Sequence, residues 1–256
     1  MSKVVKKIIS NCLRILGLRL QRITSVNTNP IIYSIKDNGL RDCLYLLKSL
    51  GFTPKRIFDI GAHKGGWTRI VREYFPESNY TLFEPQERLI QHVQDLIANE
   101  KVELINKGVG SKNEIRKFTL VGREDSCNFL FTESQAEENS FEQINIEVIT
   151  LDSFIKSQNS FVPELLKIDA EGLDLEVLKG ARALLGITEV IMIEVGVLNR
   201  NIPNNIGLVI NYMNENGYEL FDVTELNRPF DVKLLWLMEL VFILKTGEVF
   251  KSVNSL

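Results

Sequence analysis

Four acidic residues stand at or near the ends of short apolar runs: Asp59, Glu84, Asp169 and Glu194. Short apolar runs bounded by turn residues are typical of buried strands. In an open α/β sheet, ligands bind at the edge where the carboxyl ends of the parallel strands meet. We therefore expect the four carboxyl groups to lie together at one edge of a sheet and to form part of a ligand site.

The first of these acids begins a glycine-rich turn, Asp59-Ile-Gly61-Ala-His63-Lys-Gly65-Gly, which leads into an expected helix over 67–74. Glycine lets the backbone approach a ligand closely, and a helix N-terminus attracts anions. The spacing differs from the G-x-G-x-x-G pattern of dinucleotide sites. It suits a zwitterionic amino-acid group, with Asp59 facing the ammonium directly or through water and the helix N-terminus facing the carboxylate. The alternative is a tight connection without a ligand.

The second acid, Glu84, follows Asp59 by 25 residues, which is one strand-helix-strand step along the chain. A carboxylate at that strand end can accept hydrogen bonds from both hydroxyl groups of a ribose. A solvated strand end is the structural alternative. An acid in this place would also suit an NAD site, although the glycine spacing of the first loop argues against one.

The composition is that of an ordinary globular protein of 256 residues, with 45% hydrophobic residues, 25% charged residues and a net charge of -3. A basic excess that would favour nucleic acid is missing. The cysteines, Cys12, Cys43 and Cys127, lack the paired spacing of a zinc site, so a reducing, cytoplasmic compartment is the simplest inference. Two histidines are too few for a histidine-rich metal centre.

Residues 1–25 contain six lysines and arginines, no acid, and apolar residues at helical spacing. This pattern predicts a basic amphipathic helix, joined by a linker that ends near residue 30 to a domain over 31–256. The apolar runs are too short for a transmembrane span. The helix could lie on an anionic membrane at the inner face, or pack on its own domain or on a second subunit.

The remaining sequence predicts an α/β domain, because apolar runs and helical patterns alternate. The expected elements are a helix over 31–50, a strand from 56, a helix over 67–74, a strand over 80–84, a helix over 86–99, strands over 102–105, 115–121 and 144–150, a short helix from 151, a strand over 164–169, a helix after 172, a strand over 189–195, a helix over 206–216, and strands over 218–223 and 240–244. Residues 111–150 interrupt this rhythm, and we interpret them as an inserted antiparallel segment. Its polar loop could face the substrate or simply be solvated.

The most distinctive stretch is Leu166-Lys-Ile-Asp-Ala-Glu-Gly-Leu-Asp-Leu-Glu-Val-Leu-Lys-Gly-Ala181. It resembles the hallmark K-I-D-x-E-G-x-E-x-x-x-L-x-G of the FkbM-type methyltransferases. The turn from Asp59, the block Phe83-Glu84-Pro85 and the block Thr150-Leu151-Asp152 resemble other blocks of that family in the same order. The resemblance covers about residues 52–245. His63 stands where the family usually has asparagine, and Asp174 where it usually has glutamate, so detailed roles at these two positions do not carry over.

The resemblance implies a single Rossmann-like class I methyltransferase domain, with a mostly parallel seven-stranded sheet, helices on both faces and an antiparallel last strand. It implies S-adenosylmethionine as methyl donor and, as acceptor, a hydroxyl group of a saccharide, a glycan or a related secondary metabolite. The cofactor-binding residues would be Asp59, Gly61, His63, Gly65, Glu84 and Val109.

An alcohol is a weak nucleophile, so it must be aligned with the methyl group and must lose its proton during or after transfer. Asp169 or Glu171 could orient the hydroxyl group or accept this proton. The two carboxyl groups could share a proton, or they could bind Mg²⁺, although we favour a reaction without metal. Glu171 could instead cap the next helix. Lys167, Glu194 and Arg123 are candidate substrate contacts, and Arg123 and Arg200 are candidate contacts for an anion.

Two other functions remain open from the sequence. One is an NAD-linked Rossmann oxidoreductase, which tight binding of S-adenosylhomocysteine without nicotinamide binding would exclude. The other is a scaffold protein that binds S-adenosylmethionine without turnover. All four strand-end acids are present, so nothing in the chain suggests that such a site has decayed.

Overall fold

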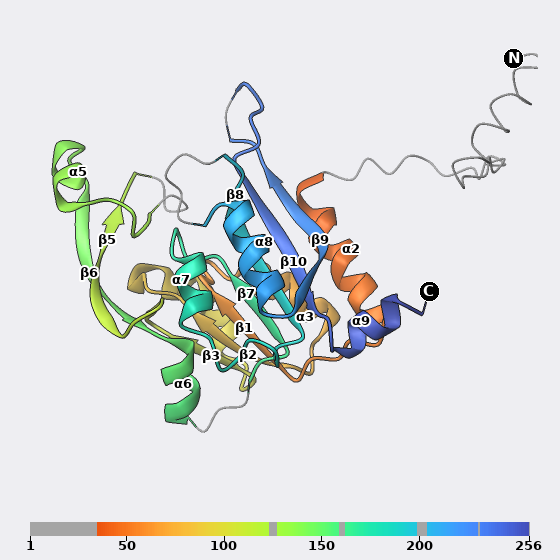
Figure 1. Ribbon diagram of the computed structural model, residues 1–256. Coiled ribbons are helices and arrows are strands. Elements are labelled where there is room, and N and C mark those ends of the chain that lie inside the picture. Colours follow the sequence, from red (N-terminus) through yellow and green to blue (C-terminus); the bar gives the residue numbers. More distant parts are fainter. Residues whose placement is uncertain (1–34, 123–126, 159–161, 199–203, 230, 256) are drawn as a thin grey trace, which may run out of the picture. The chain divides into compact units, whose positions relative to one another are not determined.

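The computed structural model describes residues 35–122, 127–158, 162–198, 204–229 and 231–255 (Figure 1). The elements are α2 (Ile35–Ser49), β1 (Arg56–Ile60), α3 (Gly66–Tyr74), β2 (Asn79–Phe83), the 3₁₀ helix η1 (Glu87–Val93), α4 (Gln94–Ile97), β3 (Val102–Ile105), β4 (Gly108–Val109), β5 (Glu114–Leu120), α5 (Glu133–Glu138), β6 (Glu142–Ile149), α6 (Leu151–Gln158), β7 (Leu165–Ile168), α7 (Asp174–Lys179), β8 (Val190–Gly196), α8 (Ile206–Glu215), β9 (Tyr218–Asn227), β10 (Leu237–Leu244) and α9 (Glu248–Val253). The expected basic helix over 1–25, its linker, Arg123 and Arg200 lie outside the described residues.

Seven strands form the main sheet in the order β3-β2-β1-β7-β8-β10-β9. The strands from β3 to β8 are parallel, and β10 runs antiparallel to both β8 and β9. The predicted mostly parallel sheet with a reversed last strand is therefore confirmed. The strand order changes direction between β1 and β7, which is where open α/β sheets bind their ligands.

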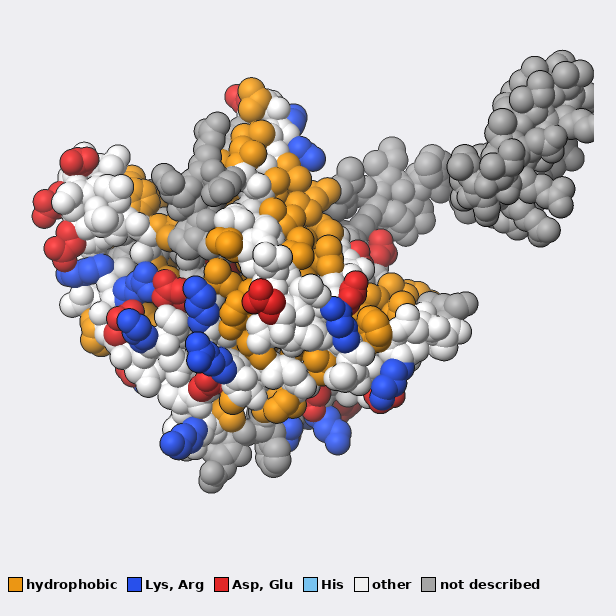
Figure 2. Space-filling model, viewed as in Figure 1, with side chains coloured by type: hydrophobic (Ala, Val, Ile, Leu, Met, Phe, Trp, Pro, Cys, Tyr) orange, Lys and Arg blue, Asp and Glu red, His pale blue; other side chains and the backbone are white. Residues whose placement is uncertain are grey.

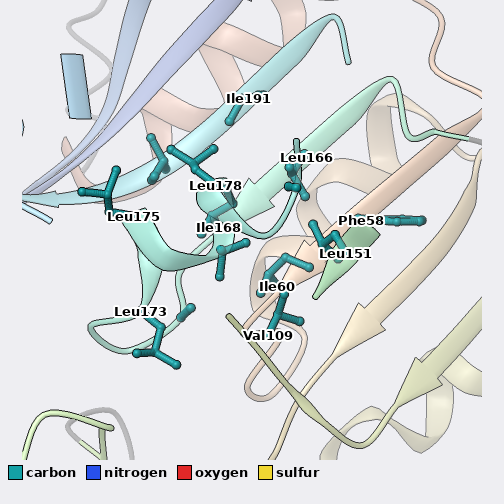
Figure 3. Packing of buried hydrophobic residues seen from close by; sticks show 14 of the residues in the cluster. Phe58, Ile60, Val109, Leu151, Leu166, Ile168, Leu173, Leu175, Leu178 and Ile191 are labelled. Carbon is teal, nitrogen blue, oxygen red and sulfur yellow. The ribbon is translucent and has the colours of Figure 1, made fainter. Parts of the chain in front are cut away.

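Apolar side chains alternate between the two faces of the central strands, as the period of a strand requires. On β1, Ile57 joins the buried cluster that contains α2 and α3, whereas Phe58 and Ile60 join the cluster that contains α6, α7 and α8. Figure 3 shows Leu175 and Leu178 of α7 beside the central strands. Because both faces are covered by helices, these strands read as nearly continuous apolar runs in the sequence.

The interruption over 111–150 forms a second sheet, with the order β4-β6-β5, as the sequence analysis expected for an antiparallel insertion. β5 and β6 pair antiparallel, and two-residue β4 pairs parallel with β6. Phe118 of β5 packs edge-to-face on Phe129, with ring centroids 4.7 Å apart. Phe118, Phe129 and Val109 belong to the same buried cluster as the central strands. The sheet of the insertion is therefore part of the core.

The helix predicted over 86–99 is wrong in form, because the chain adopts the 3₁₀ helix η1 and then the single turn α4. The break lies at Val93, next to His92, whose carbonyl oxygen accepts a hydrogen bond from Arg69 Nη2 at 2.8 Å. In a continuous helix that oxygen would accept from the backbone four residues on. Helix α5 was missed, although the capping box of Thr132 and Gln135 signals its start.

The edge strand β9 has exposed apolar side chains, among them Leu220 and Leu226, which are 43% and 46% exposed. Figure 2 shows apolar side chains gathered over β9 and β10. None of the helices that the structure describes combines the length and the apolar character needed to cross a bilayer.

Candidate functional site

A pocket of about 490 Å³ lies at the carboxyl edge of the main sheet, over the point where the strand order reverses. Its wall comes from the turns after β1, β2 and β7, from the inserted sheet and from the ends of β8, β9 and β10. The residues that line it are Ile60, Gly61, His63, Phe83, Glu84, Pro85, Gln86, Lys107, Gly108, Val109, Phe118, Asn128, Phe129, Leu130, Asp169, Ala170, Glu171, Gly172, Glu194, Asn204, Glu225, Asn227, Pro229, Trp236 and Leu237. The structure thus brings three of the four strand-end acids, Glu84, Asp169 and Glu194, to one pocket.

Glu84 is held in one orientation by backbone N–H groups. The N–H of His63 donates to Oε2 and the N–H of Gln86 donates to Oε1, both at 2.8 Å. Burial raises the pKa of Glu84 to about 6, against the effect of these two hydrogen bonds. A carboxylate oxygen has two lone pairs, so each oxygen can still accept a second hydrogen bond from the pocket. This arrangement fits a ligand with two neighbouring hydroxyl groups.

The turns after β1 and β7 cross at Gly61, where the backbone leaves no room for a side chain. Gly61 has a φ of +75°, and a Cβ there would lie 1.8 Å from the carbonyl oxygen of Asp169. Gly65, with a φ of +73°, turns the chain into α3 and does not line the pocket. His63 also has a positive φ, of +49°, and lies on the pocket wall.

Asp59 lies beneath the pocket and does not line it, because its carboxyl group is fully buried. Thr68 Oγ1 donates to Asp59 Oδ2 at 2.6 Å, and Lys167 Nζ lies 3.2 Å from Oδ1. Lys167 is also buried, 3.4 Å from Asp169 Oδ2, and it donates to the carbonyl oxygen of Gly61 at 2.9 Å. Lys167, which the sequence analysis considered as a substrate contact, does not line the pocket. Lys167 ties the first loop to the acids after β7.

The turn after β7 presents Asp169 and Glu171 to the pocket. The Asp169 side chain is 38% exposed, and Glu171 has a φ of +51°. Asp174 fixes this turn from below, because its Oδ1 accepts from the N–H of Ala170 at 2.7 Å. Its Oδ2 accepts from Asn204 Nδ2 at the same distance. The two carboxyl groups that the sequence analysis placed side by side therefore share one wall on a braced turn.

The family of the chain follows from comparison with known families. The model of the methyltransferase FkbM domain matches residues 59–220, which is more than half of the chain and includes every turn described above. The chain belongs to the FkbM methyltransferase family. It is thus a methyltransferase by family, and the NAD-linked oxidoreductase of the sequence analysis is set aside.

One solved structure shows the same fold as this FkbM-family chain. The methyltransferase FkbM from Methylobacillus flagellatus KT is 17% identical with a TM-score of 0.50, and the match covers 73% of this chain and 43% of that protein. The chain therefore spans less than half the length of that relative. A putative O-methyltransferase from Klebsiella pneumoniae has 12% identity and a TM-score of 0.45, with 95% and 90% of the two chains covered. A search of curated protein sequences found no match.

The acids of the FkbM-family pocket influence one another. Burial, then the neighbouring Asp169, raises the pKa of Glu171 to about 9. The same two causes raise the pKa of Asp174 to about 7 and that of Glu194 well above its usual value. For Lys167, burial opposes the charged form, but Asp59 and Asp169 outweigh it and raise the pKa of the ammonium. Shared protons are therefore expected in this pocket near neutral pH.

The raised pKa of Glu171 predicts that the stability of the protein falls as pH rises. In the unfolded chain this carboxyl loses its proton near pH 4.5, but in the folded chain it does so near pH 9. Between these values the folded state holds the extra proton, so each rise in pH favours unfolding. We expect Glu171→Gln and the wild type to unfold at the same temperature at pH 5. At pH 9 the midpoint of the variant should be about 2–4 °C higher, which corresponds to about 1 kcal/mol in the free energy of unfolding after solvent screening. Thermal unfolding at both pH values tests this, and a variant that lowers the midpoint at pH 9 would contradict it.

Among the residues that the structure describes, no group of three or more histidine, cysteine or acidic side chains is arranged to hold a metal ion. Asp169 and Glu171 are the pair for which Mg²⁺ was considered. The metal-free reaction remains our expectation, supported by the chemistry of the pair, which can move a proton without a metal.

Several pocket residues were not anticipated from the sequence. Asn204 and Gln86 are both 3% exposed and line the pocket. Asn204 follows β8 in a stretch without a distinctive pattern, so the sequence offered no signal for it. Glu239 does have one, because it is an acid within the otherwise apolar strand β10. Such an acid in a buried strand is costly unless it serves a site.

Proposed function

We propose that the protein is an S-adenosylmethionine-dependent O-methyltransferase that methylates a hydroxyl group of a saccharide, a glycan or a related secondary metabolite. The observation that supports this most is the division of the pocket between two halves of the sheet. Glu84, Gly61, His63 and Val109 lie over the β1-β2-β3 half, and the acids Asp169, Glu171 and Glu194 lie over the β7-β8 half. A methyl donor and an acceptor could therefore meet above the boundary between the neighbouring strands β1 and β7.

The donor half fits S-adenosylmethionine through its hydrogen-bonding groups. Each oxygen of Glu84 accepts one backbone hydrogen bond and can accept a second from a ribose hydroxyl group, and Val109 contributes an apolar side chain to the pocket wall. Asp59, paired with Lys167 and Thr68, supports the first loop from below and would act on an amino-acid moiety only through that loop. When bound, the cofactor supplies a methyl group on a positively charged sulfur.

The acceptor half contains the groups that an alcohol requires. Asp169, exposed to the pocket and held by Lys167 at 3.4 Å, can accept a hydrogen bond from the acceptor hydroxyl and orient its oxygen. Asp169 would accept the proton that the acceptor hydroxyl group loses during transfer, and would then release this proton to water. Glu171, protonated at neutral pH, can donate a hydrogen bond to a neighbouring oxygen of the acceptor. Asn128, Asn227 and the ring of Trp236 give the wall the mixed polar and aromatic character that suits a saccharide.

Glu84→Ala tests the cofactor half of this proposal. Loss of two hydrogen bonds to a charged carboxylate should weaken S-adenosylhomocysteine binding at least about 30-fold, or about 2 kcal/mol. Isothermal titration measures this, with Glu84→Gln as the isosteric variant and Glu103→Ala, on the exposed side of β3, as the matched control. An unchanged affinity in Glu84→Ala would remove Glu84 from the ribose site.

Asp169→Asn tests the acceptor half. Without a base the rate of methyl transfer should fall by about 10²–10⁴, whereas S-adenosylhomocysteine affinity stays within about threefold. The measurement is transfer of labelled methyl groups to a panel of mono- and oligosaccharides, analysed by mass. Asn keeps the shape of the side chain and can still accept from Lys167, so the fold should persist. A fully active Asp169→Asn, Glu171→Gln double variant would exclude both residues from the mechanism.

The location of the protein follows the same proposal. In a cytoplasmic enzyme that methylates a lipid-linked glycan at the inner membrane face, the basic residues 1–25 would bind the anionic membrane surface. If vesicles of anionic lipid fail to retain the full-length protein at low salt, the membrane part of this proposal is wrong.

A further inference from the structure

One buried side chain on the donor side of the pocket has a hydrogen-bond donor that the protein does not use. Gln86 lies two residues after Glu84, is 3% exposed and lines the pocket. Its Nε2 group has no acceptor among the residues that the structure describes. Unlike Asn204 Oδ1, this nitrogen is not enclosed by protein, so a ligand in the pocket can reach it.

The orientation of the Gln86 amide is fixed by its neighbour Arg88. Gln86 Oε1 accepts from Arg88 Nε at 3.2 Å and from Arg88 Nη2 at 2.8 Å. A guanidinium group has N–H donors and no acceptor, so the amide atom that faces it must be the oxygen. Arg88 is itself held, because Nη2 also donates to the buried Sγ of Cys127 at 3.3 Å. The Nε2 group is therefore left as the donor of the amide.

Gln86 is also the N-cap residue of η1, so a structural role for its side chain has to be considered. The backbone serves the helix, because the carbonyl oxygen of Gln86 accepts from the N–H of Leu89 at 2.9 Å. The side chain makes no capping hydrogen bond. Burying an amide is costly unless both of its polar atoms are paired. The local structure gives no reason for this cost, which points to a partner in the pocket.

The backbone of the same loop cannot supply a donor in place of this side chain. The residues of the loop after β2 that line the pocket are Glu84, Pro85 and Gln86. The N–H of Glu84 donates to the carbonyl oxygen of Ile105 at 3.2 Å, and that of Gln86 donates to Glu84 Oε1 at 2.8 Å. Proline has no N–H. Of the donors on these three residues, only Gln86 Nε2 remains for a ligand.

We propose that Gln86 Nε2 donates a hydrogen bond to N3 of the adenine ring of the methyl donor, and that Arg88 is the positioning residue that orients the amide for this contact. The proposal rests on the proposed function, in which Glu84 accepts from the ribose hydroxyl groups. N3 is the acceptor on the minor-groove edge of adenine, and the 2′-hydroxyl group lies on the same edge of a nucleoside. A donor beside the carboxylate that binds the ribose therefore suits N3.

An oxygen of the methyl acceptor is the competing partner of Gln86 Nε2. Gln86 follows β2, in the half of the sheet that contains β1, β2 and β3, whereas the acids of the acceptor half follow β7 or end β8. Ile60 and Phe83, which pair at the ends of β1 and β2, give this half of the pocket apolar side chains that suit a flat ring. The position of Gln86 therefore favours the donor over the acceptor.

The test compares S-adenosylhomocysteine with its 3-deaza and 7-deaza analogues, in which a C–H group replaces N3 or N7 of the base. Affinities for the full chain are measured by isothermal titration at pH 8, where Glu84 is ionised. We expect the wild type to bind the 3-deaza analogue at least about 10-fold more weakly than S-adenosylhomocysteine, and the 7-deaza analogue within about threefold.

Gln86→Met should remove this preference for N3, because it removes the donor. The variant should bind S-adenosylhomocysteine about as weakly as the wild type binds the 3-deaza analogue, and replacing N3 should then have no further effect. The matched control is Gln94→Met, the same substitution at the exposed first residue of α4, which should keep the full preference.

Arg88→Met tests the positioning role. Without the guanidinium group the amide can turn, so the preference for N3 should fall below about threefold. Arg88→Lys still offers a donor to Gln86 Oε1 and should restore a preference of at least about fivefold. A purely structural role of Arg88 would weaken the binding of both ligands equally and leave the preference unchanged.

A wild-type preference for N3 below about threefold, or one that survives Gln86→Met, would overturn the proposal. So would a loss of affinity for the 7-deaza analogue in place of the 3-deaza analogue. If Gln86→Met does not fold, as judged by circular dichroism, Gln86→Glu takes its place, because it keeps the contact with Arg88 but offers no donor. Failure of the wild type to bind S-adenosylhomocysteine would instead contradict the proposed function, so the two failures are distinguishable.

Discussion

Lys167→Met is expected to destabilise the protein by about 3–5 kcal/mol, because removing one partner of a buried ion pair leaves the other charge uncompensated. The ammonium group lies 3.2 Å from Asp59, which is fully buried, and 3.4 Å from Asp169. Thr68 alone would remain as a donor to Asp59. Since the whole free energy of unfolding of a domain is typically about 5–15 kcal/mol, the variant should be only marginally folded at 25 °C.

Chemical denaturation of four proteins measures this effect: the wild type, Lys167→Met, Asp59→Asn and the double variant. The two single changes touch the same pair, so their effects should not add. We expect the double variant to be more stable than Lys167→Met, because the neutral amide no longer needs a counter-charge. If Lys167→Met lowers the free energy of unfolding by less than about 1 kcal/mol, the ion pair of Lys167 and Asp59 does not hold the two turns together.

Gly61→Ala is expected to have an effect of similar size for a different reason. The added Cβ would lie 1.8 Å from the carbonyl oxygen of Asp169, which is backbone and cannot rotate away. The φ of +75° adds about 1–2 kcal/mol for any residue with a side chain. The collision can be relieved only if the turns after β1 and β7 separate. The total loss in the free energy of unfolding should therefore exceed about 4 kcal/mol, and S-adenosylhomocysteine binding should be lost.

Gly51→Ala is the matched control for this variant. Gly51 has a φ of +89°, yet a Cβ there would meet nothing within 4 Å. The control therefore has the conformational cost without the collision, and it should lose only about 1–2 kcal/mol. The difference in the free energy of unfolding between the two variants isolates the crossing of the turns. Equal losses would mean that the crossing can relax without cost.

The sequence was sufficient for the fold because the central strands are apolar on both faces and each ends at an acid or a turn. The strand over 102–105 was predicted with its true bounds, and β7 and β8 were each within one residue at either end. The errors fell where tertiary contacts decide the local structure. The helix predicted over 86–99 is one example, because the carbonyl oxygen of His92 near the break accepts from Arg69, which is 23 residues earlier in the chain.

The site was predicted less completely than the fold. Strand-end position correctly placed Glu84, Asp169 and Glu194 on the pocket wall. It could not show that Asp59 lies beneath the wall, because which face of β1 this residue takes depends on the partner Lys167 from β7. Nor could it find Asn204, which is defined as a pocket residue only by its contacts with Asp174 and Glu194.

The pairing of β1 with β7 has a consequence for how the chain is made. Lys167 Nζ donates to the carbonyl oxygen of Ile60, 107 residues earlier in the chain. During synthesis β1, β2 and β3 emerge early, but Asp59 cannot be buried as a paired charge until β7 has followed. Domains generally fold as units, and parallel pairing over such a separation is slow. A chain interrupted on the ribosome before β7 is therefore expected to leave Asp59 without its charged partner and the pocket without its acceptor half.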